Sequence, residues 1–266
     1  MPLLFSTMPI LYLVPTPLGD PDDITLRALR ILREARAVAA DNPTPAQTLL
    51  DHYQISTPLI AYDAALAALA SGDVALIAAS GTPGIGGAAH ELVIEALARG
   101  IRVEALPGAS AEITALVLSG LSTEAFVYVG ALPDDLNKYA HERATMIFTV
   151  NDVTEALMTL FAALGDRRLC VAARLTQATE GIFRGTLRDA LEYDRGQDVP
   201  YDILIVVEGA TEEIAELWDE VRVQSTLRER LNAGEPLKQA AKAVAAAAGW
   251  DRRTVYALGV EMKKNF

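Results

Sequence analysis

A chain of 266 residues, 51% of them hydrophobic and 22% charged, is long enough to bury two cores and too apolar to be disordered. Its net charge of −12 argues against a protein that coats nucleic acid nonspecifically. No apolar run reaches the length of a membrane span, and residues 1–7 make a poor signal peptide. The single cysteine, Cys170, cannot form an internal disulfide, so we expect a cytoplasmic protein in a reducing compartment.

The first half of the chain alternates short apolar runs with helical patterns. Strands are expected at 10–14, 74–78 and 103–106, and helices after residue 23, at 88–99 and up to 118. Asp22 or Asp23 is expected to cap the first of these helices. Repeated strand–helix units predict an α/β fold with a mostly parallel sheet covered by helices.

The alternation stops at Gly120 and restarts, which predicts a domain boundary at 120–123. Further strands are expected at 126–129, 146–149, 169–172 and 203–207, and helices at 153–164 and 187–192. We therefore expect a first α/β domain over 9–118 and a second over 121–210 with a mixed sheet.

The remaining residues, 211–266, predict a helical tail of different character. Three helices are expected at 227–231, 238–248 and 252–262, and the short glycine turn between the last two gives a helix-turn-helix pattern. Residues 226–264 hold eight basic and four acidic side chains, so this segment carries +4 and the rest of the chain −16. The tail is then either a cap packed on the body or a surface for an anionic partner, bound through the basic pairs 252–253 and 263–264.

Three loops that follow strands are the candidate ligand site: 15–20, 80–87 and 106–111. Each offers unpaired backbone groups and little side-chain bulk, which suits a ligand held by main-chain hydrogen bonds at strand ends. None is a Walker loop or a dinucleotide-binding glycine motif. His52, His90 and His141 lack metal-ligand spacing, so no metal site is expected.

Taken in order, these loops resemble the tetrapyrrole methylase superfamily of S-adenosylmethionine-dependent enzymes, and within it the small-subunit ribosomal RNA cytidine 2′-O-methyltransferases. The matches are to Val-Pro-Thr-Pro-(Ile/Leu)-Gly at 14–19, Asp-Ile-Thr-x-Arg-Ala at 23–28, Ala-Gly-Thr-Pro-Gly-Ile at 80–85, and Leu-Pro-Gly-x-Ser-Ala at 106–111. Segments 130–133 and 182–187 also match. The resemblance runs from about residue 9 to residue 262.

The resemblance implies a two-domain tetrapyrrole-methylase-like α/β fold with a helix-turn-helix-like tail, which usually forms a homodimer. It implies S-adenosylmethionine in the cleft between the domains and methyl transfer to a hydroxyl oxygen. The residues implied to line the cofactor are Leu18, Ser80, Gly81, Thr82, Ile85, Ser110 and Ala111 from the first domain, and Val150, Leu175 and Ile203 from the second. No catalytic base is identified.

The chain departs from the family pattern at several charged positions. Residues 41–44 lack the arginine of the acidic-Asp-Thr-Arg motif, residues 78–83 lack an aspartate, and 149–154 differ from Tyr-Glu-(Ser/Ala)-x-His-Arg. The family's Ala-Arg-Glu-Leu-Thr-Lys reads Ala-Ala-Arg-Leu-Thr-Gln at 172–177. Arg174, expected at a strand end facing the cleft, is the candidate for a substituted polar role.

Three functions stay open on this basis. The first is an active methyltransferase that acts on a cytidine 2′-hydroxyl of small-subunit ribosomal RNA, with the basic tail contacting RNA or the small ribosomal subunit. The second is a catalytically impaired paralogue that binds a ligand or partner without methyl transfer. The third is a methylase of a small tetrapyrrole-like substrate, in which a basic helical tail serves no clear purpose.

Overall fold

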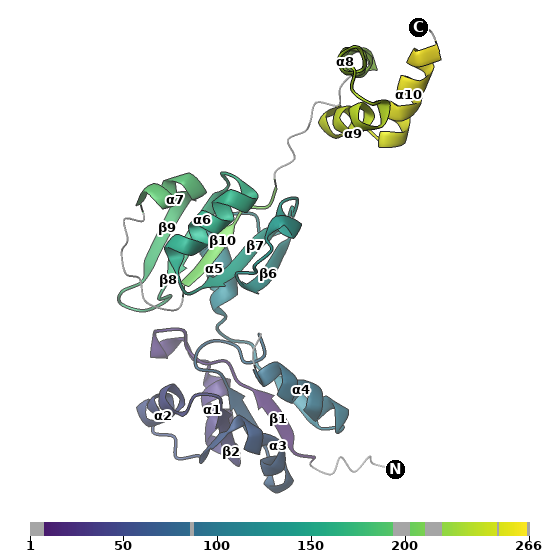
Figure 1. Ribbon diagram of the computed structural model, residues 1–266. Coiled ribbons are helices and arrows are strands. Elements are labelled where there is room, and N and C mark those ends of the chain that lie inside the picture. The colour runs from purple at the N-terminus through teal and green to yellow at the C-terminus, as the bar shows by residue number, and fades with distance from the viewer. Residues whose placement is uncertain (1–7, 86–87, 194–202, 211–219, 249, 265–266) are drawn as a thin grey trace. The chain divides into compact units, whose positions relative to one another are not determined.

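The computed structural model describes residues 8–85, 88–193, 203–210, 220–248 and 250–264. The chain divides into two compact units, which separate between residues 210 and 211. Within the described residues, the first unit holds two five-stranded β-sheets with their helices, and the second holds three helices (Figure 1).

The first sheet is parallel throughout and has the strand order β3-β2-β4-β1-β5. Its strands are β1 (Ile10–Leu13), β2 (Ala37–Ala40), β3 (Leu59–Ala61), β4 (Val74–Ile77) and β5 (Arg102–Ala105). The central strands β2 and β4 are buried along their whole length, because helices cover both faces of the sheet. The expected parallel sheet is confirmed. β2 and β3 were not predicted, because one is mostly alanine and the other only three residues long.

Helices pack on both faces of this sheet. One face carries α1 (Leu26–Glu34) and α2 (Pro43–His52), which bury Leu32 and Leu50 against it. The other carries α3 (Ala65–Ala68) and α4 (Ala88–Ala98). Three short 3₁₀ turns, η1 (Pro21–Asp23), η2 (Tyr62–Ala64) and η3 (Leu69–Ser71), complete this part of the unit.

The expected helix cap at Asp22 or Asp23 is wrong. Both aspartates lie in η1, which Asp20 caps by accepting a hydrogen bond from the backbone N–H of Asp22 at 2.9 Å. Ile24 is extended, so α1 starts later, and Thr25 caps it by accepting from the N–H of Ala28 at 3.1 Å. Pro21 fixes a turn conformation early in this segment, which places the aspartates ahead of the helix.

The second sheet is mixed and has the order β6-β7-β10-β8-β9. Its strands are β6 (Phe126–Ala131), β7 (Thr145–Val150), β8 (Arg168–Ala173), β9 (Gly181–Thr186) and β10 (Ile203–Val207). β6 runs parallel to β7, and the other neighbours are antiparallel. The turn η4 (Asn137–Tyr139) follows β6. The expected mixed sheet is confirmed, whereas β9 was not predicted because glycines and an arginine interrupt its apolar residues.

Helices cover both faces of the second sheet as well. α6 (Val153–Leu164) and α7 (Leu187–Tyr193) share a core with one face, and α5 (Ala111–Ser119) packs on the other (Figure 1). α5 buries Ala115 and Leu116 against β8 and β10, and the carbonyl oxygen of Leu118 accepts a hydrogen bond from Arg184 Nε at 2.7 Å. The expected boundary after residue 118 therefore assigns α5 to the first domain, whereas its apolar face packs on the second sheet.

The second unit is a bundle of α8 (Glu220–Asn232), α9 (Leu237–Ala248) and α10 (Arg252–Lys264). Val223, Leu227, Val244 and Val255 form its core. α10 begins after Asp251, whose carboxylate accepts from the N–H of Arg253 at 2.9 Å and of Thr254 at 3.1 Å. The three expected helices are present, and α8 starts seven residues earlier than expected; the side chains of residues 263–264 lie outside the described set. None of the helices in the described ranges has the length and apolarity to cross a bilayer.

Candidate functional site

The three candidate loops follow β1, β4 and β5, which are adjacent strands of the first sheet. The N–H of Thr16 donates to Gly81 O at 2.9 Å, and the N–H of Gly81 donates to Thr16 O at 3.1 Å. The hydroxyl of Thr82 donates to Ala109 O at 2.8 Å. Backbone and hydroxyl bonds therefore fix the loops to one another at the carboxyl edge of the parallel sheet, where α/β folds place ligands.

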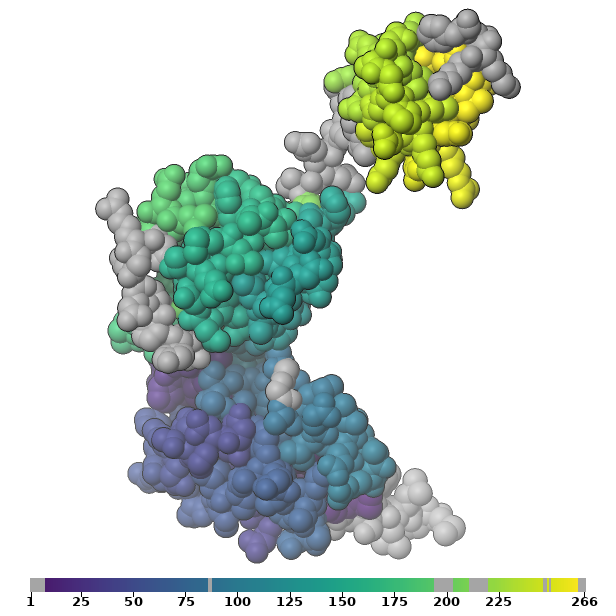
Figure 2. Space-filling view, in the orientation of Figure 1, coloured from purple at the N-terminus to yellow at the C-terminus, as the bar shows by residue number. Residues whose placement is uncertain are grey.

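A fourth loop, which follows β8 in the second sheet, contacts the first of these. The N–H of Asp20 donates to the Thr176 hydroxyl at 2.9 Å. A Cβ on Gly19 would lie 2.7 Å from the carbonyl oxygen of Leu175, closer than real Cβ atoms come, so the contact requires glycine. Figure 2 shows the purple and blue first half of this unit in contact with the teal and green second half.

A cavity of about 180 Å³ lies where these loops meet. Five residues that the resemblance implied as cofactor contacts line it: Leu18, Ser80, Ala111, Leu175 and Ile203. Leu18 also lines a larger cavity of about 400 Å³ over the first sheet, together with Pro17 and Ala79. The structure thus brings residues from four loops and two sheets to one space.

Three other implied residues lie in the loops without lining the cavity. Gly81 has a φ of +71°, and a Cβ there would lie 3.3 Å from Leu18 Cδ2 and 3.9 Å from the nitrogen of Ala111. Thr82 is held by its bond to Ala109, and Ser110 caps α5 by accepting from the N–H of Ile113 at 3.4 Å. These residues shape the wall around Leu18 and Ala111.

The last two implied residues lie elsewhere. Ile85 is 40% exposed and does not line the cavity. Val150 is buried in the core that α6 shares with the second sheet, because side chains alternate between the two faces of β7. Its neighbour Thr149 points to the opposite face and lines the cavity instead.

Six further residues line the cavity: Glu112, Tyr128, Thr149, Arg174, Gln177 and Leu204. Only Arg174 was singled out from the sequence. The hydroxyls of Tyr128 and Thr149 lie 3.2 Å apart, which joins neighbouring strands β6 and β7 at this point. Glu112 gave no signal, since an acidic residue in the first turn of a helix is the usual complement of the helix dipole.

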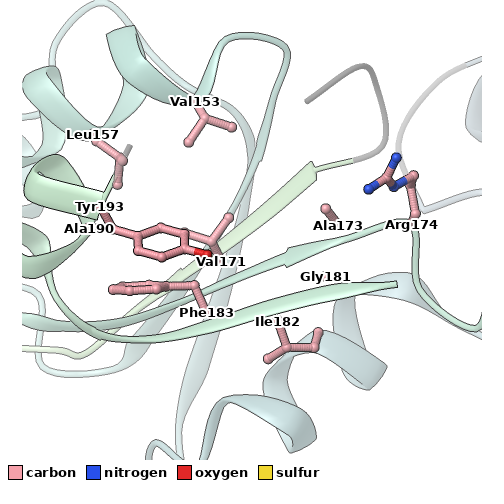
Figure 3. A pocket seen from close by; sticks show the side chains of 10 residues that line it. All are labelled: Val153, Leu157, Val171, Ala173, Arg174, Gly181, Ile182, Phe183, Ala190 and Tyr193. Carbon is pink, nitrogen blue, oxygen red and sulfur yellow. The ribbon is translucent and has the colours of Figure 1, made fainter. Parts of the chain in front are cut away.

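A third cavity, of about 300 Å³, lies on the α6 and α7 face of the second sheet (Figure 3). Its walls are mainly apolar, and the rings of Phe183 and Tyr193 stack with centroids 5.2 Å apart and planes at 28°. Arg174 lies at its end, beyond Ala173 and apart from both rings (Figure 3). Arg174, which follows the end of β8, therefore borders this cavity and the one of about 180 Å³.

Buried groups behind the loops stay in their neutral forms. Burial raises the pKa of the Cys170 thiol in the core beneath α5. Burial also raises the pKa of Tyr62, whose hydroxyl donates to Ile77 O at 2.6 Å at the end of β4. Within the described ranges, no group of three or more His, Cys, Asp or Glu side chains could hold a metal ion.

A cavity at the carboxyl edge of the parallel sheet, lined by residues from both sheets, defines the class of protein: an α/β protein that binds a small organic ligand between two sheets. The family model Tetrapyrrole (Corrin/Porphyrin) Methylases matches residues 10–191, and a model of the RsmI C-terminal HTH domain matches 219–263. The chain belongs to the tetrapyrrole methylase family.

Similarity to known proteins supports this assignment. Ribosomal RNA small subunit methyltransferase I of Halalkalibacterium halodurans is 32% identical, over 92% of this chain and 93% of that protein. The protein of the same name from Synechocystis is 34% identical, over 96% and 99%. A cobalt precorrin-4 methyltransferase of cobalamin biosynthesis shares the fold at a TM-score of 0.60 and 20% identity, over 75% of this chain and 94% of that one.

S-adenosylmethionine, the expected cofactor, is confirmed as the methyl donor by this family membership. The residues present fit such a molecule. Small-molecule sites usually measure about 300–1,000 Å³, so the 180 Å³ cavity is too small by itself, and the 400 Å³ cavity, which shares Leu18 with it, supplies the remaining room. Gly81 keeps the wall between Leu18 and Ala111 free of a side chain.

Proposed function

We propose that this protein transfers the methyl group of S-adenosylmethionine to the 2′-hydroxyl of a cytidine in small-subunit ribosomal RNA. The observation that carries this proposal is the extent of the likeness. Relatives named ribosomal RNA small subunit methyltransferase I match more than nine-tenths of the chain, and the tail separately matches a domain model of that group.

The cavity residues would act by binding and orientation. When bound, the cofactor supplies an electrophilic methyl group on its sulfonium. Of the set implied by the resemblance, we assign its contacts to Leu18, Ser80, Gly81, Thr82, Ser110, Ala111, Leu175 and Ile203, and not to Ile85 and Val150, which lie away from the cavity. Loops fixed by the Thr16–Gly81 and Thr82–Ala109 bonds would hold the donor rigidly, which favours transfer to an acceptor aligned with it.

The tail is proposed to contact RNA. Arg252 and Arg253 are exposed at the start of α10, and residues 226–264 carry a net charge of +4 in a chain whose net charge is −12. Lysine and arginine bind phosphates and release counterions, so this basic segment supports RNA recognition by the tail. The same segment favours an RNA acceptor over a small tetrapyrrole-like one.

We also propose a cytoplasmic homodimer with α/β domains at 9–118 and 121–210 and a helical tail at 211–266. Apolar side chains on two helices support the dimer: Ile94 and Leu97 of α4 are 49% and 58% exposed, and Ile113 and Val117 of α5 are 44% and 67% exposed. Exposed apolar side chains on helices are typical of surfaces that a partner covers. Light scattering coupled to size exclusion measures this, and a monomer at micromolar concentration would contradict it.

A second candidate, the impaired paralogue, has support of its own. Asn42 and Asp152, in segments where the family pattern is charged, cap α2 and α6 by accepting from Thr44 N and Glu155 N at 3.1 and 2.9 Å. Those segments serve helix capping here. A positioned base contributes about 10²–10⁴-fold in rate, so transfer without one would be slow.

One experiment separates the candidates. Small ribosomal subunits that lack the modification are incubated with the protein and cofactor labelled in its methyl group, and binding of S-adenosylhomocysteine is measured by calorimetry in parallel. Stoichiometric labelling supports the enzyme, and binding without labelling supports the impaired paralogue. Failure to bind the cofactor product would overturn the enzyme.

A further inference from the structure

Arg174 is held in an unusual backbone conformation at the edge of the cavity. Its φ is +51°, and Thr176 two residues later has a φ of +60°, although neither is glycine. The loop is fixed by bonds from Gln177 N to Arg174 O at 3.1 Å and from Thr176 N to a carboxylate oxygen of Glu180 at 2.8 Å. Left-handed conformations of non-glycine residues persist where surrounding contacts impose them, and such positions cluster at ligand sites.

The guanidinium of Arg174 lacks a partner in this position. Its Nε is buried and has no hydrogen-bond partner among the described residues. A buried donor that makes no bond is unfavourable, and an arginine fork is suited to a carboxylate. Arg174 borders two cavities, and the one of about 180 Å³ is where the candidate loops meet, so the side chain points to an anionic group of a ligand there.

Glu112 supplies the opposite charge in the same cavity. It lies in the first turn of α5, and its Oε2 accepts a hydrogen bond from the Ser110 hydroxyl at 2.7 Å, which orients the carboxylate. Glu112 and Arg174 both line the cavity, and no ion pair joins these two described residues. One unpaired cation and one oriented anion in a small cavity are complementary to a zwitterion.

We propose that Arg174 binds the α-carboxylate, and Glu112 the α-ammonium, of the methionine end of S-adenosylmethionine. The inference rests on the proposed cofactor site. It assigns two residues outside the set implied by the resemblance, and Arg174 stands where the family motif has glutamate. The cavity of about 400 Å³, which shares Leu18 with this one, is left for the adenosyl end.

Calorimetry on the full-length protein tests the pairing with two ligands. S-adenosylhomocysteine retains the carboxylate, whereas decarboxylated S-adenosylhomocysteine lacks only that group and keeps the amine. Each ligand is titrated into the parent, Arg174→Gln and Glu112→Gln. Arg168→Gln is the matched control, because this exposed arginine at the start of β8, the strand that Arg174 follows, pairs with Glu208 and does not line the cavity.

Arg174→Gln should weaken S-adenosylhomocysteine about 10- to 100-fold, since hydrogen bonds between charged groups are the strong class. Loss of the carboxylate from the ligand should weaken binding to the parent and Glu112→Gln but not to Arg174→Gln. Glu112→Gln should weaken both ligands, and Arg168→Gln neither. Circular dichroism checks that each variant is folded, and the two-ligand comparison on the parent needs no variant.

Two results would overturn the pairing while leaving the cofactor site intact. One is equal affinity of the parent and folded Arg174→Gln for S-adenosylhomocysteine. The other is that removal of the ligand's carboxylate lowers the affinity of the parent and of Arg174→Gln by the same factor. A parent that binds neither ligand would instead overturn the proposed function, and this inference with it.

Discussion

Replacement of Gly81 by leucine should abolish cofactor binding in a protein that still folds. Gly81 lies at a φ of +71°, so any other residue there costs about 1 to 2 kcal/mol in backbone strain. A new Cβ would lie 3.3 Å from Leu18 Cδ2, which must move by a few tenths of an ångström. The rest of the leucine side chain would then compete with the ligand for a cavity of about 180 Å³.

Gly84 is the matched control for this variant. It belongs to the same loop and has a φ of +96°, but a Cβ there would meet no atom within 4 Å. Gly84→Leu should therefore lose a similar free energy of unfolding, measured by urea denaturation, and keep its affinity for S-adenosylhomocysteine. Gly81→Leu should lose at least about 100-fold in affinity by calorimetry, equivalent to about 2.7 kcal/mol. Parental affinity in Gly81→Leu, or an equal loss in Gly84→Leu, would refute the placement of the site.

Three further predictions concern the rest of the chain. Combined Arg252→Ala and Arg253→Ala substitutions should weaken binding to small-subunit RNA and flatten its salt dependence. The slope of log affinity against log salt concentration should change by about 0.7–0.9 for each phosphate that is no longer neutralised. An unchanged slope in a filter-binding series would rule out a role for these arginines in RNA binding. Thr25→Ala should lower the free energy of unfolding by about 1 kcal/mol, because it removes the cap of α1, and an unchanged urea midpoint would contradict this. Burial raises the pKa of the Cys170 thiol above its value in the unfolded chain, which is about 8.5. The contribution of the neutral thiol to stability is therefore full below that pH and is lost as the pH rises above it. If the free energy of unfolding of the parent and of Cys170→Ala depends on pH in the same way between about pH 8 and 10, the prediction is contradicted.

Much of the fold could be predicted from the sequence, because local patterns determine it. The runs that became β1, β4 and β10 are continuous apolar segments, and α6 was expected at its observed limits of 153–164. Packing between elements could not be predicted in this way. α5 follows β5 along the chain, yet it packs on the second sheet because Ala115 and Leu116 fit against β8 and β10.

The same difference between local patterns and tertiary packing applies to the candidate site. Leu18, Ser80 and Ala111 could be found because they lie in short loops with recognisable motifs, and the structure gathers them at one cavity. Tyr128 and Thr149 have no such motif, since what brings them to the cavity is their position on neighbouring strands of the second sheet. Their role depends on tertiary pairing that no single segment encodes.

The central claim is that this chain methylates a cytidine 2′-hydroxyl, and nucleoside analysis of the RNA tests it most directly. Small ribosomal subunits without the modification are treated with protein and cofactor, the RNA is digested to nucleosides, and 2′-O-methylcytidine is quantified by mass spectrometry. The account predicts that this nucleoside appears in proportion to subunits and that Gly81→Leu produces none. Methylation of a base instead of the ribose, or no methylated nucleoside from a folded protein that binds S-adenosylhomocysteine, would contradict it.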